Sequence, residues 1–365
     1  MTFTAMEARF MARALKLAAK GLFTTDPNPR VGCVVVKDGT IVGEEWHVRA
    51  GEAHAEVLAL NQAGDRARDA DIFVTLEPCN HYGRTPPCTD AVLRSGARRV
   101  VCAMQDPNPL TDGKGFARLR AAGIDVQSGL LEAQAQALNP GFVSRTRRGR
   151  PYVRVKVAAS LDGRIAMASG ESRWITGAAA RTDVQRLRAR SSAVVTGIGT
   201  VLADDPLLTV REWDIGRQPL RVVLDSRLRM PPAAQMLRQP GRTLIATASS
   251  DAQRAQALTA TGAEIAQLRG VDGRTDLSQL MQFIAKFDLN EVLVEAGAQV
   301  TGAFLAAGLV DELVIYFAPT LLGDAGQGMF HLPALRVLAD RYELQLTDAR
   351  AVGADWRMTA RVIEK

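Results

Sequence analysis

The stretch "GEAHAEVLAL", residues 51–60, predicts a helix whose first turn carries reactive side chains. A glycine and a glutamate close the preceding loop, and an apolar run follows directly. In mid-helix His54 and Glu56 would point apart, because neighbours on one helical face lie three or four residues from each other. In a first turn both can point toward one place. The stretch therefore predicts a helix that begins at the floor of a pocket.

Strands and helices alternate on both sides of this stretch. Two strands are predicted to meet at the Asp-Gly turn of residues 38–39, a pair typical of a β-hairpin. Helices between strands indicate an α/β layer sandwich up to about residue 144. The predicted helices are 5–21, one from 54, 88–95, one near 114 and one ending near 143; the predicted strands are 31–39, 41–46, 70–78, 98–104 and 124–129.

The Arg-rich segment 145–150 has the composition of a linker, and 365 residues are too many for one ordinary core. We therefore predict two domains, 1–145 and 150–365. The second domain is also an α/β series. It begins with strand 152–160, includes helices 177–189, 277–287 and 298–308, and ends with β structure after residue 342.

The composition is that of a globular protein, with 47% apolar and 23% charged residues. Apolar runs stay shorter than the roughly 18 residues of a membrane span, and the N-terminal sequence does not resemble a signal peptide. We expect a cytoplasmic protein without a membrane partner. The net charge is +6, but the arginines are dispersed and only 5% of residues are aromatic. These features favour a small anionic ligand and argue against a nucleic-acid partner.

Four cysteines are too few for a disulfide framework in a chain of this length. Cys33 and Cys102 lie inside β-branched runs and are predicted to be buried. Cys79 follows a predicted strand and Cys88 starts a predicted helix, where thiolates are favoured. Together with His54 they provide three nitrogen and sulfur ligands, the pattern of a catalytic zinc site that keeps its fourth position for water.

Glu56 is then expected to move a proton rather than to bind the metal. Zinc lowers the pKa of its bound water to about 7, and a nearby carboxylate can take the proton and deliver it to the substrate. The alternative is a closed zinc site without chemistry, in which His47 or His81 completes the tetrahedron. That alternative leaves Glu56 without a purpose.

The first half resembles the deaminase half of the bifunctional diaminohydroxyphosphoribosylaminopyrimidine deaminase/reductase family of riboflavin biosynthesis. The resemblance rests on "PNPRVGCVVV", "HAEVLAL" and "LEPCNHYGRTPPCTDAV", and the wide spacing of the two cysteines follows this family rather than other zinc-dependent nucleobase deaminases. It implies a cytidine-deaminase-like three-layer α/β/α fold and places Asn28 in contact with substrate. His47 and His81 are further candidates for substrate contact. All three could also be ordinary loop residues.

The second half has no G-x-G-x-x-G after a strand, which argues against a standard Rossmann domain. Gly197 and Gly199 are weak evidence by themselves. A more specific signal is the strand that leads to Gly297 and to a helix with Gly302 in its first turns. Small residues there would let the backbone approach a pyrophosphate at the helix N-terminus.

The second half also resembles the reductase half of the same family, on the ordered motifs "KVAASLDGRIA", "ESRWITG", "TGIGTVLADDPLLTVR" and "VEAG". The resemblance implies a dihydrofolate-reductase-like α/β domain that uses NADPH. The implied cofactor-binding residues are Ala158, Trp174, Thr200, Asp204, Ser226, Gly297, Ala298, Gln299, Val300, Thr301, Gly302 and Ala303. The implied substrate-binding residues are Ser172, Arg188, Leu208, Arg211 and Glu295.

Several of these residues also have simpler explanations. Arg188 and Arg211 can clamp a ribose phosphate as charged forks, although single arginines are more often surface residues. Trp174 could equally be a core residue. Lys156 and Asp162 stand at the edge of an apolar strand and are expected to line the site.

Together the two resemblances imply an enzyme that deaminates 2,5-diamino-6-(5-phosphoribosylamino)pyrimidin-4-one and then reduces its ribosyl group with NADPH. We expect a homo-oligomer that acts on a small phosphorylated pyrimidine and uses Zn²⁺ and NADPH. Two alternatives remain. One is a nucleic-acid base deaminase with an accessory RNA-binding domain, and the other is a non-catalytic, zinc-stabilised ligand-binding protein.

Overall fold

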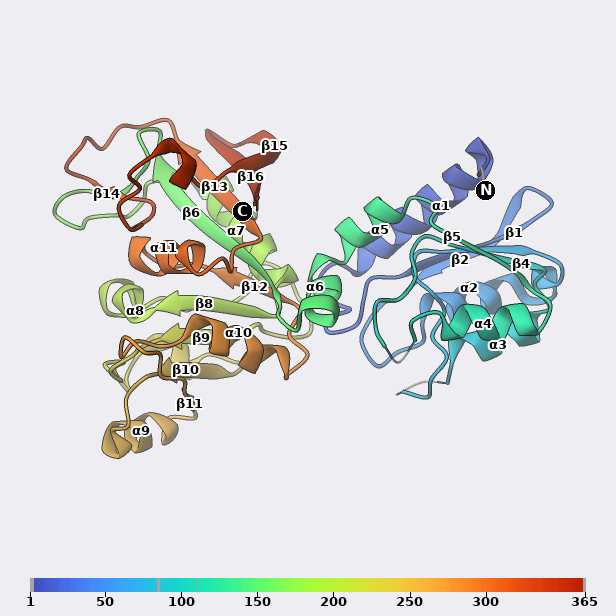
Figure 1. Ribbon diagram of the computed structural model, residues 1–365, viewed down its shortest axis with the longest axis horizontal. Helices are drawn as coiled ribbons and strands as arrows, with labels where there is room; N and C mark the ends of the chain where they lie inside the picture. The colour runs from blue at the N-terminus through green and yellow to red at the C-terminus, as the bar shows by residue number, and fades with distance from the viewer. Residues whose placement is uncertain (1–2, 84–85, 110, 364–365) are drawn as a thin grey trace. The chain divides into compact units, whose positions relative to one another are not determined.

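The computed structural model describes residues 3–83, 86–109 and 111–363. Contacts within the chain separate two compact units, Met1–Gly149 and Arg150–Lys365 (Figure 1). The first unit has one hydrophobic core cluster and the second unit has two. Within the described ranges, no helix is both long and apolar enough to cross a membrane.

The first unit is a five-stranded sheet between two layers of helices. The strand order is β2-β1-β3-β4-β5; β1 is antiparallel to β2 and to β3, whereas β3, β4 and β5 are parallel. Figure 1 shows α1 and α5 on one face of the sheet and α2, α3 and α4 on the other. The strands are β1 (Gly32–Lys37), β2 (Thr40–Trp46), β3 (Asp71–Val74), β4 (Arg99–Cys102) and β5 (Asp125–Ser128). The helices are α1 (Ala5–Ala18), α2 (Ala55–Ala63), α3 (Cys88–Ser95), α4 (Lys114–Ala121), α5 (Glu132–Leu138) and α6 (Pro140–Arg148).

Two glycines let these helices approach the sheet closely. A Cβ on Gly32 would lie 2.1 Å from the carbonyl oxygen of Ala14 in α1. A Cβ on Gly43 would lie 2.2 Å from the carbonyl oxygen of Ala59 in α2. Side chains alternate between the two faces along a strand, so the pairing register puts these glycines on opposite faces. Helices therefore cover both faces of the β1–β2 hairpin.

The second unit has a nine-stranded sheet of order β11-β10-β9-β8-β12-β6-β13-β16-β15 and a small sheet of β14 and β7. The strands from β11 to β13 are parallel to their neighbours, and β16 and β15 add an antiparallel edge. The strands are β6 (Tyr152–Ser160), β7 (Arg164–Ala166), β8 (Ala193–Gly197), β9 (Leu220–Leu224), β10 (Thr243–Thr247), β11 (Glu264–Gln267), β12 (Glu291–Val294), β13 (Glu312–Ala318), β14 (Gln327–Gly328), β15 (Leu344–Val352) and β16 (Asp355–Val362). The helices are α7 (Ala178–Arg190), α8 (Ile198–Asp204), α9 (Ala252–Thr259), α10 (Leu277–Ala285) and α11 (Ala298–Ala306).

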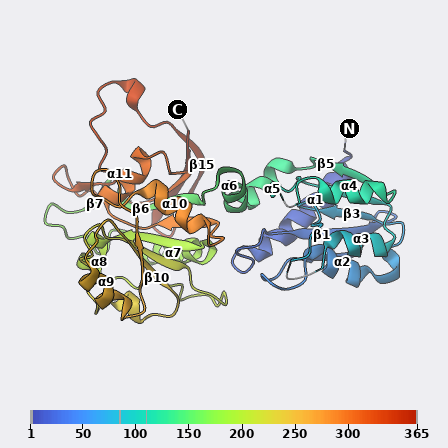
Figure 2. The ribbon, with the colours of Figure 1, turned by 60° about the horizontal axis from the view of Figure 1, so that its bottom comes forward.

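Helices cover both faces of this sheet and create two separate cores. In β8, Val194 packs with α7, α8 and α9, whereas its neighbour Val195 packs with α10 and α11. Leu293 and Val294 of β12 divide between the two cores in the same way. Parallel strands that are buried on both faces read as continuous apolar runs, which these strands do. Figure 2 shows the helices of the second unit on the two sides of its sheet.

The structure differs from the sequence prediction around residues 129–150. The single helix expected to end near residue 143 is two helices, α5 and α6, which meet at Asn139 and Pro140. Pro140 occupies the start of α6, where the missing N–H is tolerated, and it cannot continue α5. Most of the Arg-rich segment expected to be a linker is the last turn of α6. Helices α8 and α9 were not predicted.

Candidate active sites

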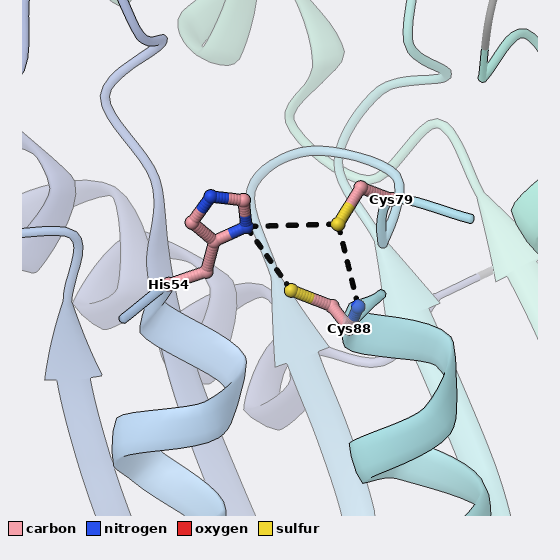
Figure 3. Close-up of side chains that lie close together, drawn as sticks. All are labelled: His54, Cys79 and Cys88. Carbon is pink, nitrogen blue, oxygen red and sulfur yellow. Dashed lines mark hydrogen bonds between the residues drawn. The ribbon is translucent and has the colours of Figure 1, made fainter. Parts of the chain in front are cut away.

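Three elements of the first unit bring His54, Cys79 and Cys88 together (Figure 3). His54 is the N-cap residue of α2, and Cys88 is the first residue of α3. Cys79 follows the carboxyl end of β3. Strand ends and helix starts meet at one edge of an α/β sheet, where sites typically form.

The three side chains present a compact set of donor atoms. The His54 Nδ1 lies 3.2 Å from the Cys88 sulfur and 3.6 Å from the Cys79 sulfur. The backbone N–H of Cys88 donates to the Cys79 sulfur at 3.3 Å. All three donor atoms lie within 4.8 Å of one another. One imidazole nitrogen and two sulfurs are ligands that zinc prefers, so the residues fit this metal.

The two sulfurs also fit a cation electrostatically. The Cys88 side chain is the main cause that lowers the pKa of the Cys79 thiol, to about 4, against the opposing effect of burial. In turn the Cys79 side chain, followed by burial, raises the pKa of Cys88. Cys79 is therefore the more acidic thiol of the pair. A divalent cation would stabilise both sulfurs as thiolates.

Glu56 lies in the first turn of α2, beside this set but outside it. The carboxylate is not one of the donors that cluster with His54 among the described residues, and its side chain is only 3% exposed. Burial raises the pKa of Glu56 to about 7, and the nearby His54 acts in the opposite direction. A buried carboxyl with this pKa can exchange protons near neutral pH.

His47 and Asn28 form a second group next to the metal-ligand set. The His47 Nδ1 lies 3.2 Å from the Ala53 carbonyl oxygen, and its Nε2 lies 3.1 Å from the Asn28 amide nitrogen. These partners assign the Nδ1–H as the donor to Ala53 and Nε2 as the acceptor from Asn28. Burial lowers the pKa of His47, which agrees with a neutral ring. Neither His47 nor His81 belongs to the set of clustered metal donors.

His81 stands on the loop that follows Cys79. Its Nδ1 lies 3.5 Å from the hydroxyl of Thr111, a fully buried residue. Thr111 also hydrogen bonds to the buried Asp106. The His81 ring is therefore linked through one hydroxyl to the segment that precedes α4.

In the second unit, two glycine turns lie side by side at the carboxyl edge of the sheet. Gly297 follows β12 and is the N-cap residue of α11, and Gly197 ends the neighbouring strand β8 before α8. A Cβ on Gly197 would lie 2.8 Å from Val300 in α11. A Cβ on Gly297 would meet no atom within 4 Å. The α11 N-terminus is thus open to an anionic group, as a cofactor diphosphate requires.

Gly302 packs closely against the backbone of His331. A Cβ there would lie 2.0 Å from the carbonyl oxygen of His331. Thr301 is fully buried and donates its hydroxyl to the Met329 carbonyl at 2.9 Å. This part of α11 packs against segment 329–331, so packing within the domain requires a small residue at position 302.

Arg188 and Glu295 form a bidentate ion pair in the second unit. The Nε–Oε1 and Nη2–Oε2 distances are 2.6 and 2.9 Å, and the two side chains are 13% and 9% exposed. Lys156 interacts electrostatically with both groups, and burial lowers its pKa. The sequence suggested Arg188 as a phosphate clamp, but its guanidinium already donates two hydrogen bonds to the Glu295 carboxylate. Arg211, by contrast, is exposed.

These further predicted residues are spread over five loops and elements. Trp174 is 71% exposed, which rules out the core role, and the Arg181 guanidinium lies 4.7 Å from its ring centroid. Leu208 is buried in the core of the α7 face. Ser226 accepts a hydrogen bond from the Thr275 N–H at 3.0 Å. Ala158 lies on β6, and Ser172 lies two residues before Trp174. Thr200 and Asp204 lie on α8.

Asp162 does not simply line a site. Its carboxylate accepts the backbone N–H groups of Leu322 and Gly323 at 3.1 and 2.8 Å, and the Ser160 hydroxyl also donates to it. The side chain therefore joins the β6–β7 turn to the loop after β13.

Comparisons with known proteins match both units. The RibD C-terminal domain family matches residues 151–358. The cytidine and deoxycytidylate deaminase zinc-binding region matches residues 5–104. The riboflavin biosynthesis protein RibD of Escherichia coli is 51% identical, over 95% of this chain and 96% of that protein. This chain belongs to the RibD family.

Solved structures of RibD proteins have the same fold over their full length. Form 1 of Acinetobacter baumannii RibD is similar with a TM-score of 0.92 and 45% identity, covering 98% of this chain and 99% of that one. The deaminase/reductase of Thermotoga maritima is similar with a TM-score of 0.86 and 34% identity, at the same coverage. The first unit therefore has the cytidine-deaminase-like fold and the second the dihydrofolate-reductase-like fold of RibD, as the sequence predicted.

The RibD-family matches also imply Zn²⁺ for the first unit and NADPH for the second, as the sequence predicted. The zinc-binding region that matches includes all three clustered donors. Sequence reasoning overlooked Glu77, Asp106 and Thr111, which are buried around the Cys79 loop. One signal was available, because Glu77 is a charged residue at the end of an apolar strand, directly before Pro-Cys.

Proposed function

We propose that this RibD-family chain catalyses two successive reactions of riboflavin biosynthesis. The first unit hydrolytically removes the ring 2-amino group of 2,5-diamino-6-(5-phosphoribosylamino)pyrimidin-4-one and releases ammonia. The second unit reduces the ribosyl group of the deaminated product to ribityl with NADPH. The convergence of one imidazole and two sulfurs beside a buried Glu56 is the observation that carries the proposal.

In the deaminase unit, His54, Cys79 and Cys88 hold zinc. When bound, zinc supplies an acidic water as a nucleophile at neutral pH. Glu56 takes one proton from the attacking water on its carboxylate and delivers it to the ring nitrogen. It then takes the second proton of the same water and delivers it to the amine, which leaves as ammonia. Burial, which raises the pKa of this carboxyl, favours uptake of the proton. Asn28 and His47, joined to each other, orient the pyrimidine.

In the reductase unit, NADPH supplies the hydride when it is bound. The Gly297 turn and the N–H groups at the start of α11 hold its diphosphate. The Arg188–Glu295 pair and Lys156 present charged groups to the substrate from α7, β6 and the end of β12. The exposed guanidinium of Arg211 is free to approach the substrate phosphate.

Two further properties belong to the proposal. We infer a cytoplasmic location, because the proposed zinc site needs the sulfurs of Cys79 and Cys88 as thiolates and not as a disulfide, as in a reducing compartment. We also infer a homo-oligomer, since Leu338, Leu346 and Trp356 of the second unit are more than half exposed. Light scattering on the purified chain measures the oligomeric state.

Neither alternative function has support from the matches. A nucleic-acid base deaminase does not explain the RibD C-terminal match over residues 151–358. A non-catalytic zinc protein does not explain why a buried acid stands beside the metal donors.

The deciding experiment is Glu56→Gln in the full-length chain. We expect one zinc per chain, as in the unmodified protein, and at least a hundredfold loss of ammonia release, because the amide cannot carry the proton. NADPH oxidation with the deaminated substrate should be unchanged. Atomic absorption, an ammonia assay and absorbance of NADPH measure the three quantities.

Glu132→Gln on α5 is the matched control, because this exposed carboxylate accepts a hydrogen bond from Gln136. It should behave as the unmodified protein in all three measurements. If the Glu56 variant released ammonia at the full rate, Glu56 would not be a catalytic residue.

A further inference from the structure

Glu77 is a buried carboxylate that collects four backbone N–H groups. Its side chain follows β3, and the residue is 3% exposed. Oε2 accepts from the N–H groups of Asp106 and Gly113 at 3.1 and 3.0 Å. Oε1 accepts from Gly115 and Phe116 at 3.0 and 3.3 Å. Both oxygens are thereby used as acceptors, as suits an ionised carboxylate.

These donors come from the loop before α4 and from the first turn of this helix. Gly113 is the N-cap residue of α4, and its φ of +76° is a conformation that glycine adopts readily. The first N–H groups of a helix have no partner within it, and the helix dipole favours a negative charge there. Glu77 therefore satisfies the start of α4 and holds it against the end of β3.

Helix α4 in turn packs closely against the carbonyl group of Pro78, the residue before Cys79. A Cβ on Gly115 would lie 2.2 Å from the carbonyl oxygen of Pro78. On its other side Cys79 is held by α3, because its carbonyl accepts the Thr89 N–H at 3.2 Å and its sulfur accepts the Cys88 N–H at 3.3 Å. The backbone of Cys79 is thus restrained both before and after the sulfur-bearing residue.

Glu77 does not itself reach the donor set of His54, Cys79 and Cys88. Its oxygens are already engaged by the four N–H groups, so a direct part in proton transfer or metal binding has no geometric basis. What Glu77 can do is fix where the Cys79 sulfur stands. Residues that orient metal ligands commonly change metal affinity or activity by 10- to 100-fold when they are replaced.

We propose that Glu77 is a positioning residue of the deaminase centre, which sets the Cys79 sulfur by tying the start of α4 to the Glu77–Pro78 segment. This inference rests on the proposed zinc-dependent deaminase function. It predicts two ways to disturb the sulfur, which overlap because a Cβ on Gly115 would also lie 3.1 Å from Glu77 Oε1. Glu77→Gln puts an amide NH₂ against backbone N–H groups and loses acceptors, and Gly115→Ala pushes the Pro78 carbonyl away while keeping Glu77.

The test uses the full-length zinc-loaded chain and both variants. We expect each variant to release zinc to a chelator about tenfold faster or more, and to lose about 10- to 100-fold in deaminase kcat with KM within threefold. In the cobalt-substituted protein, the thiolate-to-cobalt absorption band should shift in both variants. Asp112→Asn is the matched control, because this exposed loop carboxylate bonds to the exposed Gln105 amide at 2.8 Å, and it should match the unmodified chain.

The outcomes separate this inference from the function on which it rests. If the unmodified chain neither holds zinc nor releases ammonia, the proposed function fails and the inference fails with it. If the unmodified chain does both, and Glu77→Gln has the same zinc release, kcat and cobalt spectrum, only the inference is overturned. If Glu77→Gln does not fold, Gly115→Ala decides by the same measurements. Loss of the helical circular-dichroism signal in both variants would overturn a positioning role in favour of a purely structural one.

Discussion

The Arg188–Glu295 pair shows how burial changes the role of charged side chains. Burial acts to raise the pKa of Glu295, but the charge and hydrogen bonds of Arg188 outweigh it and lower that pKa. Lys156 adds to the same effect. From sequence alone Arg188 was a candidate phosphate clamp. The residues around it do not indicate that its guanidinium bonds to a carboxylate 107 positions away. The pair therefore presents a preformed charged surface and not a free guanidinium.

Glu295→Gln should destabilise the second unit by about 3 kcal/mol, because it leaves a buried guanidinium without its counter-charge. Calorimetry of the full-length chain, with the transition of the first unit as internal reference, measures the change. Glu264→Gln, which breaks the exposed pair with Arg242, should cost at most about 1 kcal/mol. Equal effects of the two substitutions would contradict the argument from burial.

The same substitution predicts a change in pH dependence. Since the pKa of Glu295 is lowered in the folded state, its stabilisation is present above the unfolded value near 4.5 and is lost as pH falls through the folded value. The stability of the second unit should therefore fall more steeply below pH 4.5 in the unmodified chain than in Glu295→Gln. Parallel curves for the two proteins would show that Glu295 has no lowered pKa.

At the scale of elements, the Asn139 side chain helps to hold the junction of α5 and α6. The Asn139 side-chain amide accepts the Arg30 N–H at 2.8 Å and donates to the Arg30 carbonyl at 3.0 Å, across 109 positions of sequence. Asn139 is 2% exposed, so both bonds are shielded from water. Arg30 follows the Asn28 loop by two residues. The helix junction thus supports a loop proposed to bind substrate.

Asn139→Asp should weaken the first unit, because a carboxylate cannot donate to the Arg30 carbonyl. We expect a loss of about 1–3 kcal/mol for the buried bond and a several-fold rise in the deaminase KM, with kcat nearly unchanged. Calorimetry and steady-state ammonia release measure both. Gln136→Ala on α5, whose half-buried side chain bonds to the exposed Glu132, serves as control. An unchanged KM in a destabilised variant would limit Asn139 to a structural role.

On the scale of the whole molecule, the proposed catalytic groups divide between two units that have separate cores. The metal donors all lie within Met1–Gly149, and the Gly297 turn lies within Arg150–Lys365. Each unit buries enough apolar surface to form its own hydrophobic core. The two chemistries should therefore fail independently.

Removal of zinc with a chelator should abolish ammonia release. The rate at which NADPH is oxidised with the deaminated substrate should stay within twofold of its starting value. Added zinc should restore ammonia release. Both rates are measured on the same sample before and after dialysis. A parallel loss of both activities would show that the units depend on each other.

Local sequence was sufficient where short-range chemistry decides the structure. The Asp-Gly pair at 38–39 predicts the hairpin, and both residues have positive φ in the structure. The alternation of apolar strands and helices predicts the layered α/β folds, and helix starts at His54 and Cys88 were expected from their position after loops. These features depend on neighbours within a few residues, which the sequence displays directly.

The tertiary structure alone decided what long-range contacts impose. Three such contacts join residues 29 to 107 positions apart. They are the four N–H groups that bond to Glu77, the pair of Arg188 with Glu295, and the packing of Gly302 against His331. A buried charge or a glycine in a sequence indicates a constraint but not its partner. The partner is fixed only when the sheet brings distant segments to one edge, because desolvation and close packing act between atoms in space and not along the chain.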